Sequence, residues 1–195
     1  MLFNMDWFSE YHYILGSKSP RRQQLLQMLG IDFEVRTCEI PEKYPSGLSK
    51  EAIPLFLAEL KAKPLISELE DGDLLITADT IVWLNGEVIG KPKDSNDARQ
   101  MLSRLSGRSH QVISGVCLSS VKKQVSFFAK SEVTFKKLTL QEIDFYISQS
   151  NPLDKAGSYG IQDWIGVIGI VGIKGSFYNV MGLPVQKLYA EIQKF

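Results

Sequence analysis

Hydrophobic residues along the chain recur with two different spacings, and the spacing changes from one segment to the next. Short continuous apolar runs, such as residues 13–15 and 74–78, indicate strands that are buried on both faces. Segments with apolar residues three or four positions apart indicate amphipathic helices. The helices predicted in this way span about residues 20–29, 50–69, 95–105, 139–148 and 185–195, and the remaining strands span about residues 33–38, 81–84, 87–89, 111–119 and 125–135.

Turn and capping residues support these boundaries. Asn85-Gly86 lies between two apolar runs, which is a strong signal for a β-hairpin. Ser19 and Ser49 predict helix N-caps, and Thr139 with Glu142 forms a capping box. The hairpin and the last two strands are antiparallel elements, whereas strands and helices alternate elsewhere. The pattern therefore predicts an α/β fold with a mixed β-sheet flanked by helices.

The composition excludes several classes of protein. The chain has 195 residues, of which 44% are apolar and 23% are charged, as in globular domains. It is therefore not expected to be disordered, fibrous or a coiled coil. Its 22 basic and 22 acidic residues give a formal net charge of zero, so the totals favour neither nucleic acid nor a membrane surface as a partner. The length corresponds to one domain, and no linker divides it.

The N-terminal residues and the cysteines bear on the compartment. Residues 1–13 carry acidic side chains and no basic region before an apolar run, so they do not resemble a signal peptide. The longest apolar stretch, residues 164–173, is shorter than the about 20 residues that span a bilayer. Cys38 and Cys117 belong to no CxxC pair and are expected to be reduced and mostly buried. We therefore expect a cytoplasmic protein in which residues 1–12 extend a domain that starts at residue 13.

A turn rich in small and basic residues joins the first strand to the first helix. Two serines, a lysine and two arginines lie within residues 17–22. The free N–H groups and the positive end of the helix dipole favour an anion here, and arginine binds phosphate through two parallel hydrogen bonds. The segment predicts a phosphate-binding site. The alternative is a solvated helix start, where basic residues are mildly unfavourable.

Acidic residues and lysines that could carry chemistry follow further along the chain. Asp79 comes directly after the strand 74–78, at the sheet edge where ligands bind in open α/β folds. Lys91 follows the returning arm of the hairpin, Glu42 lies in an irregular segment, and Lys61 lies within a helix. Each has an ordinary alternative, which is an N-cap or turn role for Asp79 and a solvated surface position for the lysines.

The stretch from residue 154 to residue 162 is rich in glycine and predicts tight turns that either wrap a planar ligand or form an ordinary loop. The amide of Gln162 offers a donor and an acceptor for a base edge; alternatively, it ties the loop to its own backbone. His12 and His110 are far apart and fit no zinc motif. Carboxylates without histidines favour a hard cation such as Mg²⁺ or Mn²⁺.

Six motifs occur in the order seen in Maf-like nucleoside triphosphate pyrophosphatases, and the chain resembles this family from residue 13 to about residue 194. Any one motif is weak, but six in order are highly specific. Two departures from the usual family pattern, Gly16 for alanine and Gln24 for glutamate, look peripheral. The motifs are Ser-x-Ser-Pro-Arg-Arg at residues 17–22, Ala78-Asp79-Thr80, Gly90-Lys91-Pro92, Leu105-Ser106-Gly107-Arg108 with His110, residues 154–162, and Gly182-Leu183-Pro184.

The resemblance implies a fold, an activity and an assembly. The fold would be Maf/ITPase-like, with two lobes and a central cleft, and residues 13–195 would form a single catalytic domain. The activity would be hydrolysis of dTTP and UTP to the nucleoside monophosphate and pyrophosphate, with CTP and modified pyrimidine nucleotides as further candidates. The family pattern also implies a divalent metal, Mg²⁺ or Mn²⁺, and a homodimer.

The resemblance assigns roles to residues at matching positions. Asp79 matches the family's proton acceptor and Glu42 its second acidic residue, and these two carboxylates are the implied metal ligands. Lys61 and Lys91 match two active-site lysines. The residues alone leave open which carboxylate binds metal and which accepts the proton. The implied substrate-binding residues are Ser17, Ser19, Arg21, Arg22, Thr80 and Gln162, of which Arg21, Thr80 and Gln162 separate the dTTP/UTP branch from the branch acting on methylated GTP.

Two other functions compete with this expectation. The chain could be a non-enzymatic nucleotide-binding protein or a regulator of septum formation, since the family has been linked to cell division. A defective enzyme should lack an expected catalytic residue, whereas all four are present. A phosphatase acting on other phosphate esters is the third alternative, and it would release inorganic phosphate instead of pyrophosphate.

Overall fold

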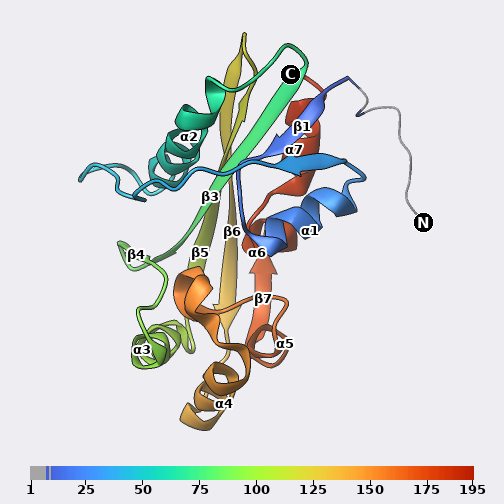
Figure 1. Cartoon of the computed structure of the whole chain (residues 1–195). Coiled ribbons are helices and arrows are strands. Elements are labelled where there is room, and N and C mark those ends of the chain that lie inside the picture. The colour runs from blue at the N-terminus through green and yellow to red at the C-terminus, as the bar shows by residue number, and fades with distance from the viewer. Residues whose placement is uncertain (1–7, 9) are drawn as a thin grey trace. The chain divides into compact units, whose positions relative to one another are not determined.

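The computed structural model describes residue 8 and residues 10–195, which form two compact units. The first unit contains the described residues up to 79 together with residues 114–129 and 182–195, and the second contains residues 80–113 and 130–181. Three long strands supply residues to both units (Figure 1): β3 (Asp73–Leu84), β5 (Ser109–Ser119) and β6 (Gln124–Phe135). The expected two lobes are confirmed, and the cleft stays a prediction.

The strands pair in both directions. Their order is β2-β1-β3-β5-β6-β7, with β4 (Glu87–Ile89) paired to β3. In the first unit, β1 (His12–Leu15) is parallel to β2 (Phe33–Val35) and to β3. In the second unit, β4 is antiparallel to β3, and β7 (Ile170–Lys174) is antiparallel to β6. The predicted α/β fold with a mixed sheet flanked by helices is thus confirmed.

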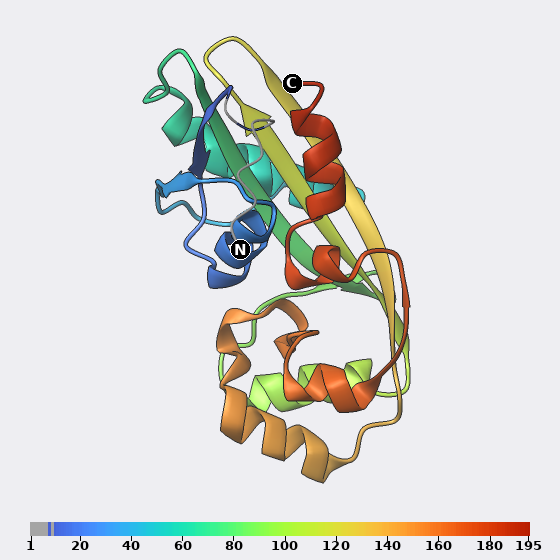
Figure 2. The same ribbon diagram turned by 90° about the vertical axis from the view of Figure 1, so that its right-hand side faces the viewer.

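Helices connect and cover the strands of the first unit. Helix α1 (Pro20–Met28) joins β1 to β2, and α2 (Ala52–Ile66) lies between β2 and β3, as parallel pairs require crossover connections. Figure 2 shows α2 behind the strands and α7 (Val185–Ile192) in front of them. The two faces of these strands are therefore covered, which explains why residues 13–15 of β1 and residues 74–78 of β3 are all buried.

Close packing fixes α2 against the strands of the first unit. Gly115 in β5 lies so near the backbone of Pro54 that a Cβ atom there would fall well inside van der Waals contact of the Pro54 carbonyl. The Thr77 hydroxyl of β3 donates to the carbonyl of Ala58 over 2.7 Å. These two contacts set the position of α2, including Lys61. A buried apolar cluster with residues from α2 and from the strands consists of Ile14, Ala58, Ala62, Leu65, Leu75 and Cys117.

The second unit is built from the hairpin and short helices. Asn85 and Gly86 have φ values of 50° and 91°, which a two-residue hairpin turn with left-handed backbone requires. The predicted capping box is confirmed, since Thr139 and Glu142 exchange side-chain and backbone hydrogen bonds. The helical segments are α3 (Ser95–Leu105), α4 (Leu140–Ser150), the 3₁₀ turns η2 (Pro152–Asp154) and η3 (Ala156–Ser158), α5 (Trp164–Gly169) and α6 (Phe177–Met181).

The long helix is shorter than predicted. The Ser49 carbonyl accepts hydrogen bonds from the N–H groups of Ala52 and Ile53, so a turn precedes the helix and Glu51 takes the N-cap position. At the other end, the helix stops at Ile66 and Ser67 takes the C-cap position. The prediction that Ser49 caps a helix over about residues 50–69 is therefore wrong at both ends. Pro64 remains inside the helix, because its neighbours are held by packing on the strands.

Strand β3 corrects the expectation for Asp79. The strand does not end at Ala78 but continues through Asp79 to Leu84, so the carboxylate lies within a strand, three residues beyond the last β3 residue that pairs with β1, Ile76. The charge is tolerated there because Lys61 pairs with it. Helix α5 and strand β7 lie within residues 164–174, where no regular element was predicted.

Most of the predicted N-terminal extension lies outside the described residues. Phe8 is buried and packs edge-on against Tyr13 and Tyr189, and β1 starts at His12. Cys117 is buried and Cys38 is exposed, so the expectation of two mostly buried thiols is correct only for Cys117. Among the described helices, none has the length and hydropathy needed to cross a bilayer.

Candidate functional site

The Ser17 hydroxyl organises the turn between β1 and α1. It is 8% exposed and accepts hydrogen bonds of 3.3 Å from the Ser19 N–H and from Nη1 of Arg22. Nε of Arg22 donates to the carbonyl of Gly182 over 2.9 Å. The N–H of Gly16 donates to the carbonyl of Ile76 over 2.8 Å, which ties the turn to β3. The turn is therefore a fixed structure that presents cationic groups at a helix start.

Burial shapes the electrostatics of this turn. Burial lowers the pKa of the Arg22 guanidinium below its usual value, while the carboxylates of Asp79 and Glu42 act in the opposite direction and Arg21 adds to the lowering. Ser19 occupies the N-cap position of α1, but its side chain makes no capping hydrogen bond. The turn thus places Arg22 within the electrostatic range of the acidic residues predicted to carry the chemistry.

Lys61 bridges the two carboxylates of the first unit. Its Nζ lies 2.5 Å from Oδ1 of Asp79 and 2.8 Å from Oε1 of Glu42. The side chains of Lys61 and Asp79 are only 16% and 10% exposed, whereas Glu42 is 44% exposed. The ion pair with Asp79 is therefore largely shielded from water, and Glu42 supplies an outer, solvent-facing carboxylate.

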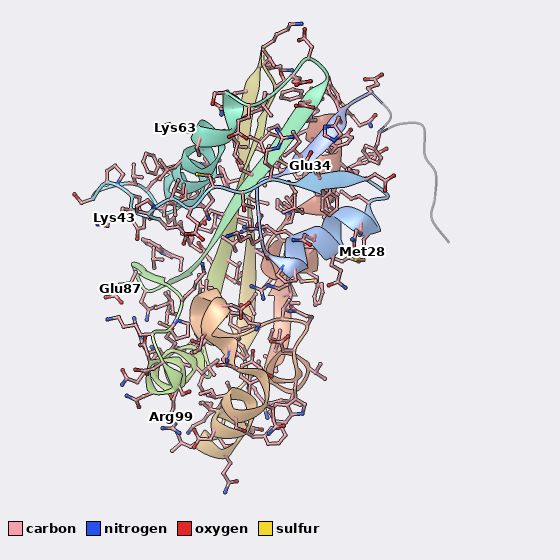
Figure 3. The ribbon with its side chains drawn as sticks, in the orientation of Figure 1. Met28, Glu34, Lys43, Lys63, Glu87 and Arg99 are labelled. Carbon is pink, nitrogen blue, oxygen red and sulfur yellow. The ribbon has the colours of Figure 1, made fainter. Side chains whose placement is uncertain are left out.

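Three separate elements bring these groups together. Lys61 comes from α2, Asp79 from β3, and Glu42 from the irregular segment between β2 and α2. Figure 3 labels Lys63, which lies two residues further along α2 and is exposed. Because successive helical residues point about 100° apart, only Lys61 of these two lysines can face β3. The alternative of a fully solvated surface position for Lys61 is not observed, and its role as an active-site lysine, which the family resemblance implies, stays a prediction.

The second unit holds the other predicted residues. Thr80 follows Asp79 in β3, Lys91 is exposed just after β4, and Gln162 is exposed in the loop before α5. The N–H of Gly157 donates to the carbonyl of Gly90 over 2.9 Å, which links the loop to the turn that carries Lys91. The Gln162 side chain makes no hydrogen bond to the described part of the chain. The alternative in which Gln162 ties the loop to its own backbone is therefore not observed.

Two contacts involve residues to which the sequence assigned no role. The carbonyl of Gly182 accepts from Arg22, although Gly182-Leu183-Pro184 stood out only as a motif. His110 and Tyr159 form a buried hydrogen bond of 2.7 Å in the second unit. Both contacts join residues that are far apart in the chain. The only signal in the sequence that could have pointed to these residues is that they belong to the ordered motifs.

The metal expectation rests on two carboxylates. Within residues 8 and 10–195, no three His, Cys, Asp or Glu side chains gather as metal ligands. Asp79 and Glu42 nevertheless converge on one cationic atom, Nζ of Lys61. Mg²⁺ is commonly held by one or two carboxylates together with substrate phosphates and water. The donor set therefore fits a hard cation that arrives with a triphosphate.

Comparisons with known proteins identify the family. A model of the family described as "Maf-like protein" matches residues 12–195. A protein of Phocaeicola vulgatus named "dTTP/UTP pyrophosphatase" is 56% identical over 195 residues, covering all of both chains. A Bacteroides thetaiotaomicron protein of the same name is 51% identical, again over all of both chains. The chain belongs to the Maf-like protein family.

A search of solved structures adds a more distant likeness. A nucleoside-triphosphatase, also titled a dITP/XTP pyrophosphatase, from Mycobacterium abscessus aligns with a TM-score of 0.41 and 17% identity. The alignment covers 64% of this chain and 74% of that one.

Proposed function

We propose that the protein is a nucleoside triphosphate pyrophosphatase that hydrolyses dTTP and UTP to the monophosphate and pyrophosphate. The observation that carries the proposal is the Lys61 ammonium held between Asp79 and Glu42, in the same unit as the Ser17–Arg22 turn. The full-length relatives named for this activity support the choice of reaction and substrates.

The proposed reaction is attack of water on the α-phosphorus. The bond between this phosphorus and the oxygen bridging to the β-phosphorus breaks, and pyrophosphate leaves. Asp79 accepts a proton from the water, and Lys61 holds the Asp79 carboxylate in place. The charges of Lys61, Lys91, Arg21 and Arg22 offset the negative charge that builds on the phosphoryl oxygens.

Asp79 and Glu42 would also hold Mg²⁺ or Mn²⁺ together with the substrate phosphates. The cation would supply charge stabilisation to the triphosphate and lower the pKa of a bound water. Since Lys61 now contacts both carboxylates, its ammonium competes with the cation for them. Because the proposed reaction needs the charge of this cation, removal of divalent cations with EDTA should abolish turnover, and added Mg²⁺ or Mn²⁺ should restore it.

Selection of the base is proposed for the second unit. The exposed amide of Gln162 offers both a donor and an acceptor, which uracil and thymine match at N3–H and a neighbouring carbonyl. A site built to hydrogen-bond one edge rejects a mismatched edge, because its polar groups are left unpaired. Thr80 and Arg21 are proposed to assist, as the family resemblance implies. A homodimeric state and a cytoplasmic location likewise remain proposals.

The decisive experiment measures products from a panel of triphosphates with Mg²⁺ or Mn²⁺. We expect pyrophosphate and monophosphate from dTTP and UTP, with a lower kcat/KM for GTP and ATP. The same panel ranks CTP and modified pyrimidine nucleotides. Release of inorganic phosphate would favour a phosphatase, and tight binding without turnover would favour a regulator. A preference for GTP or methylated GTP would refute the branch assignment alone.

A further inference from the structure

The motif around His110 has no role in the proposed reaction, yet it contains the most buried histidine contact of the described chain. His110 lies near the start of β5 and is 3% exposed. Its Nε2 is 2.7 Å from the hydroxyl of Tyr159, which is 5% exposed. Phe135 completes the cluster, stacked on the imidazole at 5.8 Å and edge-on to Tyr159 at 5.1 Å. All three residues belong to the second unit.

The pair is unusual because it is polar at a place where apolar side chains would pack as well. Nδ1 of His110 is buried and has no hydrogen-bond partner among the described residues. A buried polar atom without a partner is destabilising, and replacement of both partners by apolar groups can be neutral or stabilising. The hydrogen bond therefore offers little stability that apolar packing would not. The hydrogen bond instead fixes the orientation of the Tyr159 side chain, because it determines how deeply the ring is inserted into the cluster and how the ring is rotated.

Tyr159 belongs to the loop that ends in Gln162. The backbone of this loop is restrained by left-handed φ values of 70° at Gly157 and 61° at Ser158. The N–H of Gly160 donates to the hydroxyl of Tyr146 over 3.2 Å. Tyr159 is the side-chain anchor closest to the middle of the loop. A shift of its ring would move Gln162, which is three residues away.

The same loop reaches Lys91. The N–H of Gly157 donates to the carbonyl of Gly90, the residue before Lys91. A Cβ atom on Gly157 would lie 3.1 Å from Cγ2 of Val82, so the loop also packs on β3. A change in the loop is therefore transmitted to a proposed catalytic lysine as well as to the proposed base-reading amide.

We propose that His110 and Tyr159 are positioning residues that lock the loop over residues 157–162, so that Gln162 and Lys91 are held in register for the same substrate. This inference rests on the proposed function. It differs from a role in stability alone because it predicts coupled losses in base selection and in kcat. Gln162→Ala, by contrast, removes the amide and leaves the lock intact, so it should weaken base selection more than kcat.

The test combines hydrogen exchange with steady-state kinetics. Tyr159→Phe keeps the ring and removes only the hydroxyl, and His110→Leu removes the other partner. For both we expect loop amides to exchange about tenfold faster, and the preference for dTTP over GTP to fall about tenfold together with kcat. His110→Gln, whose amide can occupy the position of Nε2, should restore most of the slow amide exchange and most of the base preference and kcat. Ser109→Ala, which removes the neighbouring exposed hydrogen bond to Thr134, is the matched control and should change neither.

The outcomes separate this inference from the proposed function. Unchanged exchange in Tyr159→Phe and His110→Leu, or faster exchange with an unchanged base preference, would overturn the positioning role. If His110→Gln behaves like His110→Leu, the hydrogen bond is not the cause and the inference also fails. Should Tyr159→Phe not fold, the two His110 variants provide the same comparison. A wild-type chain that cleaves no pyrimidine triphosphate would instead refute the proposed function, and with it the role in base selection.

Discussion

At the scale of single residues, the proposed chemistry depends on charged groups that the fold keeps partly out of water. Asp79 and Lys61 are mostly buried and form an ion pair, which offsets part of the cost of placing such groups away from water. Glu42 is more exposed and touches the same ammonium. This asymmetry gives the two carboxylates different environments, although they share one partner. Different environments are what allow two like groups to take different roles.

Asp79→Asn should nearly abolish turnover while the fold survives. The amide has almost the same shape but cannot accept the proton or carry the charge, and such a role is worth roughly 10²–10⁴-fold in rate. The measurement is kcat on dTTP, with circular dichroism to confirm folding. Retention of more than about a tenth of wild-type turnover, on the same scale, would remove Asp79 from the proposed role.

Lys61→Met should lower kcat by about two orders of magnitude, because an electrostatic group at the developing charge is lost. Methionine keeps an unbranched side chain that is only one atom shorter, so packing of α2 is largely kept. Lys63→Met is the control, since it changes the same residue type on the same helix at an exposed position. Equal kinetic effects of the two substitutions would contradict a specific role for Lys61.

His110 should make stability depend on pH. Burial lowers its pKa to about 4, below the usual 6.5, so the unfolded chain binds a proton that the folded chain does not. The free energy of unfolding is therefore highest, as far as this histidine is concerned, above about pH 6.5. It falls by roughly 3 kcal/mol as the pH drops toward 4, because the proton binds to the unfolded chain. Urea unfolding of the wild type and of His110→Gln at several pH values measures it. Identical pH profiles for the two proteins would contradict the prediction.

At the scale of elements, helix α2 and strand β3 build the proposed catalytic centre by their mutual placement. Helix α2 is fixed by the close approach of Pro54 to Gly115 and by the hydrogen bond from Thr77 to Ala58. The Thr77–Ala58 hydrogen bond lies two residues from Asp79 and three residues from Lys61. The packing that positions α2 on the strands therefore also sets the geometry of the proposed catalytic centre.

Gly115→Ala should destabilise the protein by about 1–3 kcal/mol, because the added methyl group must displace the Pro54 backbone. Since α2 would shift, kcat on dTTP should fall as well. Gly172→Ala is the control, because a Cβ atom there would meet only Thr134 at 3.9 Å. Chemical denaturation measures both variants. A Gly115→Ala protein as stable as the control would show that α2 can move away at no cost.

At the scale of the whole molecule, the chain divides its proposed tasks between two compact units. The first contains the turn, both carboxylates and Lys61, and the second contains Thr80, Lys91 and the loop with Gln162. β3 changes units between Asp79 and Thr80, so adjacent residues of one strand fall in different units. Asp79, which is proposed to carry the chemistry, and Thr80, which is proposed to assist base selection, are therefore consecutive residues of one strand.

The proposed homodimer is tested at this scale. The chain has a mass of 22.0 kDa, so we expect a species of twice that mass in light scattering after size-exclusion chromatography. The measurement should be made across a range of concentrations, because a weak dimer dissociates on dilution. A single species of 22.0 kDa at every concentration would exclude the homodimer.

The sequence by itself determined the elements whose signals are local. The Asn85-Gly86 turn needs left-handed backbone that these residues adopt easily, and the Thr139–Glu142 capping box lies within four consecutive residues. The ordered motifs also indicated the family that the comparisons identify. In all these cases the information is contained in neighbouring residues or in their order along the chain.

Only the tertiary structure decided features that depend on contacts between distant residues. The partner of Asp79 in β3 is Lys61, which is 18 positions away in another element. The acceptor for Arg22 is Gly182, 160 positions away, and the partner of His110 is Tyr159. Local propensity cannot encode such pairings, because they arise when packing brings the elements together. The chain order thus supplied the candidate residues, and packing selected which of them touch.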